Sequence, residues 1–310
     1  MNNKTFDTVM IGAGPSALAA AVYTTREDIE TVIYEKAVIG GLAAITDKVD
    51  NYPGFPDGIE GMRLAGQLEA QARRFGAKIE FGDVSSLQVD GDEKVLVVDG
   101  EEVRAKTVLI ATGSDYNKLG IPGEAEYYGR GVHYCATCDG AFYRDKRLVV
   151  VGGGNSAVQE AIFLTRYSTH IDLLVRSSLR ASEILQKDLQ KYIGEGKITL
   201  HLGTSTDEIK IKDDKITEIV GTKDGQAVTF EADGIFIFIG LKPNTSFLDG
   251  SGIELDELGL IKTDSRLETN LPGVFASGDV RSGATMQIAS AVGEGATAAL
   301  SIREHLDKLA

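Results

Sequence analysis

The chain has 310 residues, more than one hydrophobic core usually organises, so two domains are expected. Its 46 acidic residues outnumber its 32 basic residues, and the formal net charge of −14 argues against nucleic acid and anionic membranes as partners. Apolar runs such as IFIFIGL are far shorter than the roughly 18 residues of a membrane-spanning helix, and the N-terminus lacks a secretory signal pattern, so a cytoplasmic protein is predicted.

The first predicted elements are a buried strand, a glycine-rich turn and a helix in the stretch FDTVMIGAGPSALAAAVY. Gly12 suits the tight turn, Gly14 lets backbone N–H groups approach a pyrophosphate, and Ala17 allows the helix to pack closely on the strand. Glu35 follows about 20 positions after the motif, at the end of the next predicted strand, where a carboxylate binds ribose hydroxyls. The segment therefore predicts a site for FAD or NAD.

The following segments alternate between predicted helices and predicted strands. A helix is predicted over GMRLAGQLEAQARRFG, which starts at Gly61. A buried strand is predicted over KTVLIATGS, which ends at Thr112 and Gly113 before its final serine. This alternation fits the α/β class that the first motif indicates.

Cys135 and Cys138, in the stretch YCATCDG, are the 2 cysteines of the chain. Their spacing of three positions is that of a CxxC pair. In a reducing compartment such a pair is more often metal-binding or redox-active than a structural staple.

A second strand, glycine-rich turn and helix are predicted in RLVVVGGGNSAVQEAIF. Two such motifs predict dinucleotide binding more strongly than one does. At the position equivalent to Glu35 the second copy has Val175, followed by Arg176. Because Val175 is not acidic and Arg176 is a cation that could bind a 2′-phosphate, the second motif favours NADP over NAD. The alternative is that Arg176 and Arg180 form a solvated pair at the start of a helix.

The last predicted elements complete the second half of the chain. Asp224 and Gly225 mark a hairpin turn, and DGIFIFIGLKPNT, from Asp233, predicts another buried strand. The stretch LPGVFASGDVRSG places Gly278 and Asp279 at a strand end, either as a simple turn or as the holder of a flavin's ribityl chain. SAVGEGATAALSIREHL predicts a closing helix.

Several motifs together resemble the low-molecular-weight thioredoxin reductases over nearly the full length: GAGPSA, YPG, ATGS, CATCDGAFY, GGGNSA, GLKPNT and GVFASGDV. CATCDG just ahead of a second dinucleotide motif is highly specific to that family. The resemblance implies a homodimer that passes two electrons from NADPH through FAD and a disulfide to thioredoxin. It implies an α/β fold of two Rossmann-like dinucleotide-binding domains (three-layer ββα). The FAD-binding domain would be discontinuous, at 1–116 and 245–310, and the NAD(P)H-binding-like domain with the CxxC pair, at 117–244, would be inserted into it.

The resemblance also implies roles for the CxxC stretch. Cys135 would attack or release the partner disulfide, Cys138 would face the flavin, and Asp139 would donate or accept the proton. Two sulfurs at this spacing can close a small disulfide, and thiolate attack through a mixed disulfide passes the electron pair onward. Zinc bound by His133 and both thiols is the structural alternative, but a closed zinc site normally has a fourth ligand from a second Cys or His pair, which the sequence lacks.

Two sets of nucleotide-binding residues follow from the motifs. Those expected around FAD are Gly12, Gly14, Pro15, Ser16, Ala17, Glu35, Lys36, Gly41, Leu42, Asn51, Thr112, Gly113, Gly278, Asp279, Gln287 and Ile288. Those expected around the nicotinamide nucleotide are Gly152, Gly154, Asn155, Ser156, Arg176 and Arg180.

The match to the family is incomplete near both nucleotides. Members that use NADPH usually carry a His-Arg-Arg group and a further Arg, whereas LLVRSSLRAS keeps only Arg176 and Arg180. Losing a charge-assisted hydrogen bond costs about 1.5 to 3 kcal/mol, so NADPH should bind less tightly, and a substitute donor such as reduced ferredoxin is the alternative. Near the flavin, Leu42 stands where the family often has Gln, and Met286 where it has a basic residue.

Two other functions stay open. One is a flavin-dependent reductase of ferredoxin, flavodoxin or oxygen in which the cysteines are incidental, although such relatives generally lack CATCDG. The other is a non-enzymatic flavin-binding redox sensor. The 4 histidines, His170 and His201 among them, are expected at surface or loop positions without a role.

Overall fold

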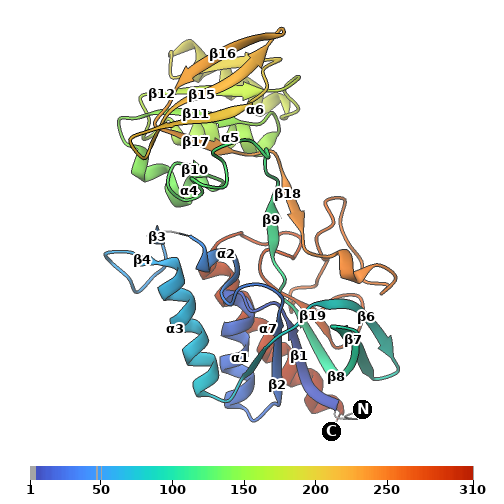
Figure 1. The fold of residues 1–310 in the computed structure, drawn as a ribbon. Coiled ribbons are helices and arrows are strands. Elements are labelled where there is room, and N and C mark those ends of the chain that lie inside the picture. The colour runs from blue at the N-terminus through green and yellow to red at the C-terminus, as the bar shows by residue number, and fades with distance from the viewer. Residues whose placement is uncertain (1–4, 47, 50, 310) are drawn as a thin grey trace. The chain divides into compact units, whose positions relative to one another are not determined.

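Figure 1 shows the computed structural model, in which the chain divides into two compact units. Unit 1 consists of Met1–Asp115 and Lys242–Ala310, and unit 2 of Tyr116–Leu241. The chain passes between the units at β9 (Ser114–Tyr116) and β18 (Leu241–Pro243), which pair as a two-stranded sheet. Unit 2 is thus inserted between two segments of unit 1. The structure describes residues 5–46, 48–49 and 51–309.

Unit 1 is built on a seven-stranded sheet. In sheet order its strands are β5 (Lys78–Phe81), β2 (Thr31–Glu35), β1 (Thr5–Ile11), β8 (Glu101–Ile110), β7 (Glu93–Val98) and β6 (Val84–Asp90), with β19 (Val274–Ala276) beside β8. The pairs β1–β2, β1–β8, β2–β5 and β8–β19 are parallel, whereas β6 and β7 add an antiparallel extension. The apolar runs of β1, β2 and β8 are buried, as expected for parallel strands covered on both faces.

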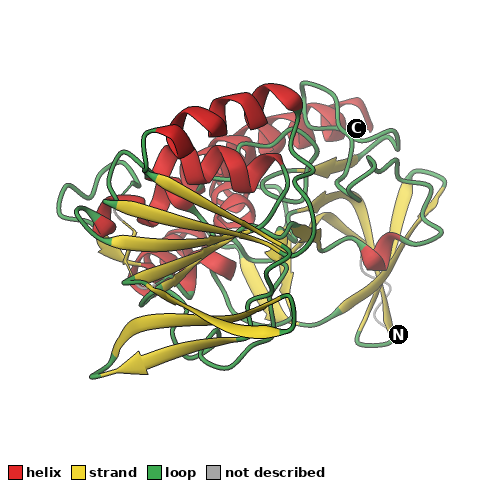
Figure 2. Cartoon of the chain, turned by 90° about the horizontal axis from the view of Figure 1, so that it is seen from above, coloured by secondary structure: helices red, strands yellow, loops and turns green. Residues whose placement is uncertain are grey.

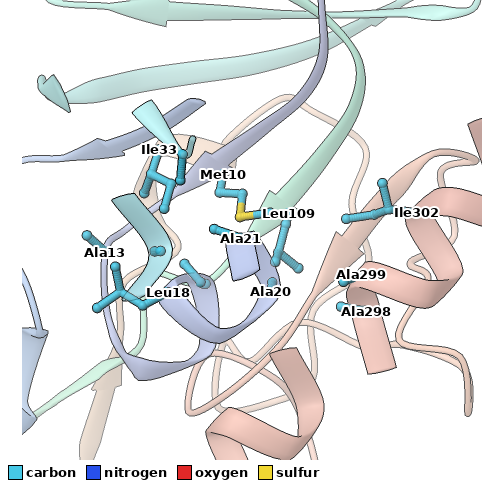
Figure 3. Close-up of a cluster of buried hydrophobic side chains, with 14 of the residues drawn as sticks. Met10, Ala13, Leu18, Ala20, Ala21, Ile33, Leu109, Ala298, Ala299 and Ile302 are labelled. Carbon is cyan, nitrogen blue, oxygen red and sulfur yellow. The ribbon is translucent and has the colours of Figure 1, made fainter. Parts of the chain in front are cut away.

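Three helices of unit 1, α1 (Pro15–Arg26), α3 (Gly61–Arg74) and α7 (Ile288–Leu309), meet this sheet in a buried cluster (Figure 3). The connections contain the short elements α2 (Gly41–Ala44), β3 (Lys48–Val49), β4 (Ile59–Glu60) and η2 (Ser246–Leu248). The cluster joins Met10 and Leu109 of the sheet to Leu18 of α1 and Ile302 of α7. The helices predicted from Gly61 and over the C-terminal stretch are confirmed.

One contact between α1 and α7 gives the first testable prediction. A Cβ atom on Gly295 of α7 would lie 2.1 Å from the carbonyl oxygen of Ser16, so Gly295→Ala is expected to push the two helices apart. Overpacking of this kind costs about 1 to 3 kcal/mol, which urea unfolding would measure as a lower free energy of unfolding.

Gly293, in the same helix, is the matched control. It is exposed, and a Cβ atom there would have no neighbour within 4 Å. Gly293→Ala is therefore expected to raise the free energy of unfolding by up to about 1 kcal/mol, because alanine is the better helix former. Equal stability of the two variants would contradict the close packing of α1 on α7.

Unit 2 has a five-stranded sheet whose strands pair in parallel. Its order is β10 (Val132–His133), β17 (Gly234–Ile237), β11 (Arg147–Val151), β12 (His170–Val175) and β13 (Ile198–Leu202). The other elements are α4 (Ala136–Asp139), η1 (Gly140–Tyr143), α5 (Asn155–Leu164), α6 (Glu183–Gly194) and an antiparallel sheet of β14 (Glu208–Lys212), β15 (Lys215–Lys223) and β16 (Gln226–Glu231).

The two faces of the parallel sheet in unit 2 are covered differently. Leu173 of β12 packs in one cluster with Val158 of α5 and Leu189 of α6. Leu174, the next residue, packs in a second cluster with Ile209 of β14 and Ile219 of β15. Because neighbouring strand residues point to opposite faces, helices cover one face and the antiparallel sheet covers the other, which is the three-layer ββα arrangement.

The α/β fold-class prediction is confirmed, and Figure 2 shows the mixture of helices and strands that it requires. The hairpin turn is also confirmed, because Asp224 and Gly225 connect β15 to β16 with φ angles of 50° and 76°. Among the helices of the described residues, none combines the length and the apolar character needed to cross a membrane.

Candidate functional site

The two cysteines are joined in a disulfide at the start of α4. Their Sγ atoms lie 2.05 Å apart and their Cα atoms 5.3 Å apart. The backbone N–H of Cys138 donates to Cys135 Sγ at 3.2 Å, and both residues are half-buried. In this bonded state the sulfurs are not thiolates that could bind zinc, and a disulfide is the form that thiol–disulfide exchange requires.

His133, the third ligand of the zinc alternative, is engaged elsewhere. Its Nδ1 lies 3.1 Å from Asp139 Oδ2, and its Nε2 lies 2.7 Å from the Tyr143 hydroxyl. The side chain is 4% exposed and belongs to β10. The expectation that the histidines occupy surface or loop positions is therefore wrong for His133. His170 and His201 lie in strands β12 and β13 and are partly exposed.

The first glycine-rich motif forms the turn between β1 and α1. Gly12 has a φ of +90°, and a Cβ atom there would lie 2.7 Å from the carbonyl oxygen of Ala111. Gly14 is the N-cap of α1, and a Cβ atom on it would meet nothing within 4 Å. The turn therefore needs a glycine at its start and leaves open space at the helix N-terminus.

Glu35 ends β2 and is oriented toward this turn. Its Oε2 accepts a hydrogen bond from the N–H of Ala13 at 2.7 Å, and its Oε1 accepts one from the N–H of Ala37 at 2.8 Å. The side chain is buried and borders a cavity of about 290 Å³, which Gly12, Lys36 and Thr112 also help to line. The structure thus brings these four predicted residues together in one cavity.

Asn244 also lines this cavity, although it is not among the residues expected around FAD. Its side-chain amide donates to the carbonyl oxygen of Thr112 at 3.0 Å, and the Thr112 hydroxyl donates to the carbonyl oxygen of Asn244 at 2.8 Å. The only signal in the sequence is its place in the GLKPNT motif. Its contact residue lies in a distant part of the chain, so local patterns could not reveal the pair.

The other predicted flavin residues of unit 1 form smaller groups. The hydroxyl oxygens of Ser16 and Ser277 lie 2.6 Å apart, and Asn51 donates to the Gln287 side chain at 3.0 Å. Burial, with the nearby Glu294 carboxylate, raises the pKa of Asp279 to about 6. The remaining predicted residues are Pro15 and Ala17 in α1, Gly41 and Leu42 in α2, Gly113 after β8, Gly278 after β19 and Ile288 at the start of α7.

The second motif is covered by the loop that follows β12. The carbonyl oxygen of Gly153 accepts the N–H of Arg180 at 2.6 Å, and Asn155 Oδ1 accepts the N–H of Ser182 at 2.8 Å. Arg176 and Arg180 are exposed in this loop, before α6 begins at Glu183. The alternative of a solvated pair at a helix start therefore holds for their exposure but not for the helix.

The turn of this second motif repeats the geometry of the first. Gly152 has a φ of +140°, and a Cβ atom there would lie 2.3 Å from the carbonyl oxygen of Phe238. Gly154 is the N-cap of α5, which Asn155 and Ser156 begin. Val175, at the end of β12, is buried and offers no carboxylate to a ribose.

A bonded CxxC pair in one unit and a glycine-rich strand-turn-helix motif in each define a nucleotide-dependent disulfide oxidoreductase. Residues 6–295 match the family described as pyridine nucleotide-disulphide oxidoreductase, and the chain belongs to this family.

Similar proteins and solved structures agree with this class. Thioredoxin reductase of Bacillus subtilis (strain 168) is 40% identical over 310 residues, covering 99% of this chain and 96% of that protein. The structure of thioredoxin reductase from Streptococcus pyogenes MGAS5005 is 38% identical and matches with a TM-score of 0.93 over 99% of this chain and 100% of that one. Lactococcus lactis thioredoxin reductase, in its FR conformation, is 40% identical and matches with a TM-score of 0.66 over 98% and 100%. The predicted family resemblance is confirmed, and the chain is an FAD-dependent oxidoreductase.

Proposed function

We propose that the chain is a thioredoxin reductase, in which electrons from NADPH or a substitute donor pass through FAD and the Cys135–Cys138 disulfide to thioredoxin. The observation that carries this proposal is the bonded CxxC pair within a chain similar over its whole length to thioredoxin reductases. We further propose that the protein works in the cytoplasm as a homodimer. Sedimentation of the purified protein would test whether it is a dimer.

The residues of unit 1 fit FAD as their cofactor. Glu35 is fixed by two backbone N–H groups at the edge of the cavity, where its carboxylate would accept hydrogen bonds from ribose hydroxyls. Gly12 and Gly14 would hold the pyrophosphate at the N-terminus of α1, and Asp279 would hold the ribityl chain. FAD, when bound, supplies the two-electron redox chemistry that no side chain of this protein provides.

The cysteines would deliver the electron pair in two steps. In the reduced enzyme the Cys135 thiolate attacks the partner disulfide, forming a mixed disulfide and releasing one partner sulfur as a thiolate. Cys138 then attacks Cys135 Sγ, which breaks the mixed disulfide and releases the second partner sulfur. The two protons of the enzyme thiols end on the partner's sulfurs, and Asp139, next to Cys138, would transfer one of them.

The electron donor is tested by mixing the purified protein anaerobically with NADPH, NADH or reduced ferredoxin while flavin absorbance is followed. Bleaching by NADPH with little bleaching by NADH is the result we expect, because Arg176 and Arg180 offer cations to the 2′-phosphate and Val175 offers no acid to a free 2′-OH. Bleaching by ferredoxin alone would contradict the nicotinamide part of the proposal.

Removing the two arginines is expected to weaken NADPH selectively. Each of Arg176→Ala and Arg180→Ala should raise the KM for NADPH by about 10-fold, because a lost charge-assisted hydrogen bond costs about 1.5 to 3 kcal/mol. The KM for NADH should stay unchanged. Arg166→Ala, which removes an exposed arginine elsewhere in unit 2, is the control for the loss of charge. An equal rise in KM for both nucleotides would argue against 2′-phosphate contacts.

A further inference from the structure

Three side chains of unit 2, from residues close to the CxxC pair in the sequence, lie in contact with one another: Tyr143 and His133 share a hydrogen bond, and His133 faces Asp139 in an ion-pair contact. The Tyr143 hydroxyl lies 2.7 Å from His133 Nε2, and His133 Nδ1 lies 3.1 Å from Asp139 Oδ2. His133 stands two positions before Cys135, and Asp139 directly follows Cys138. The side chains of His133 and Asp139 are 4% and 17% exposed, so their contact is largely shielded from water.

Residues of β17 fix the positions of the His133 and Tyr143 rings. The imidazole of His133 stacks on Phe236 with ring centres 5.0 Å apart, and Tyr143 meets Phe236 edge-on at 5.5 Å. A Cβ atom on Gly234 would lie 2.4 Å from Tyr143 Cε1, so only glycine leaves room for the tyrosine ring at that position. Packing therefore holds His133 and Tyr143 in the geometry of their hydrogen bond.

The direction of the hydrogen bond between Tyr143 and His133 follows from the surroundings of Tyr143. Burial raises the pKa of Tyr143, and the carboxylates of Asp139, from α4, and Asp233, from the turn before β17, act in the same direction. The Tyr143 hydroxyl therefore stays protonated and donates a hydrogen bond to His133 Nε2. A neutral imidazole that accepts at Nε2 carries its proton at Nδ1, on the side that faces Asp139 Oδ2 at 3.1 Å.

We propose that His133 is a positioning residue for Asp139: through its 3.1 Å contact with Oδ2 of the carboxylate it sets the orientation in which Oδ1 exchanges a proton with the cysteine pair. The inference rests on the proposed function of that pair. In the step concerned, the Cys138 thiol gives its proton to Asp139, and the Cys138 sulfur bonds to Cys135 Sγ. The bond between Cys135 and the partner sulfur breaks, the electron pair leaves with that sulfur, and Asp139 returns the proton to it.

Three substitutions of His133 separate positioning from packing. His133→Asn keeps an N–H donor near the place of Nδ1, His133→Gln places its donor nearer that of Nε2, and His133→Leu removes both. We expect His133→Leu and His133→Gln to lower kcat for thioredoxin reduction by about 10- to 100-fold at unchanged KM for thioredoxin, the usual effect of a misplaced reacting group. His133→Asn should recover most of the loss. Anaerobic reduction of the flavin should proceed at the wild-type rate in all three.

Two pH profiles complete the experiment. The pH dependence of kcat should shift in His133→Leu and return toward the wild-type curve in His133→Asn. The second profile is the pH dependence of the alkylation rate of the thiols, measured without thioredoxin in protein reduced with dithiothreitol. It should also shift in His133→Leu and return toward the wild-type curve in His133→Asn. A purely structural role for His133 would lower thermal stability without moving either profile.

The outcomes distinguish this inference from the function on which it rests. If the wild type reduces thioredoxin and all three variants match it in kcat and in both profiles, the inference is wrong while the proposed function stands. If the wild type does not reduce thioredoxin, the pH profiles of thiol alkylation alone test the inference. A shift of the profile in His133→Leu that is reversed in His133→Asn supports a positioning role for His133. Identical profiles in all variants overturn the inference. Should His133→Leu fail to fold, equal kcat values for His133→Asn and His133→Gln overturn the inference.

Discussion

Cys138→Ser is expected to lower thioredoxin reduction by at least about 10³-fold, because the variant lacks the sulfur that resolves the mixed disulfide on Cys135. Flavin reduction by the electron donor should continue, since that step precedes the cysteines in the proposed sequence. Stopped-flow absorbance would follow the flavin, and turnover with thioredoxin would follow the complete reaction in the same preparation.

The two single cysteine variants should differ in what they trap. With Cys135 intact, Cys138→Ser should form a stable covalent complex with an oxidised thioredoxin after reduction, visible as a higher-mass band that dithiothreitol removes. Cys135→Ser should form no such band if Cys135 is the attacking thiol. Undiminished thioredoxin reduction in both variants would refute the relay. A different result would favour the flavin reductase with incidental cysteines. In that case the wild type would not reduce thioredoxin, and both cysteine variants would keep oxygen-linked flavin turnover at the wild-type rate.

Local sequence patterns are sufficient to place the residues whose position depends on one strand and one turn. The first motif predicts Glu35 at the end of the following strand, and β2 does end at Glu35. It also predicts Gly12 in the tight turn, where the positive φ and the nearby backbone of Ala111 require a glycine. The carboxyl ends of parallel neighbouring strands meet at one sheet edge, so the strand pattern alone locates both residues. Their binding of FAD stays a prediction.

Contacts that depend on how separate elements turn back on one another leave no such pattern in the sequence. His133 meets Asp139 and Tyr143 only because α4 and η1 fold back beside β10 after the cysteine pair. A lone histidine in a short strand produces no periodic signal, and the sequence therefore predicts a surface position for it, which is wrong.

The loop at Arg176 and Arg180 has a similar cause. The alternative interpretation places these residues at a helix start, but the N–H of Arg180 binds the carbonyl oxygen of Gly153 and the N–H of Ser182 binds the Asn155 side chain. These bonds to the second motif hold the stretch as a loop. They also place the backbone of Arg180 beside the turn that would bind the nucleotide.

Gly12→Ala is expected to weaken FAD binding by about 10- to 100-fold, the equivalent of roughly 1 to 3 kcal/mol of steric strain. The added Cβ atom would lie 2.7 Å from the carbonyl oxygen of Ala111, and the φ of +90° is one that alanine rarely adopts. Because backbone atoms cannot move aside cheaply, the turn itself must shift, which displaces Gly14 and the N-terminus of α1 from the pyrophosphate. Titration of FAD into the apoprotein, followed by quenching of flavin fluorescence, would measure the dissociation constant.

Gly91→Ala provides the matched control for backbone conformation. Gly91, in the turn between β6 and β7, also has a positive φ, +62°, but a Cβ atom there would meet nothing within 4 Å. The control variant should therefore lose about 1 kcal/mol of stability while binding FAD like the wild type. Equal FAD affinity in the two variants would mean that the turn after β1 does not hold the pyrophosphate, and the assignment of unit 1 as the FAD-binding unit would then rest on Glu35 and Asp279 alone.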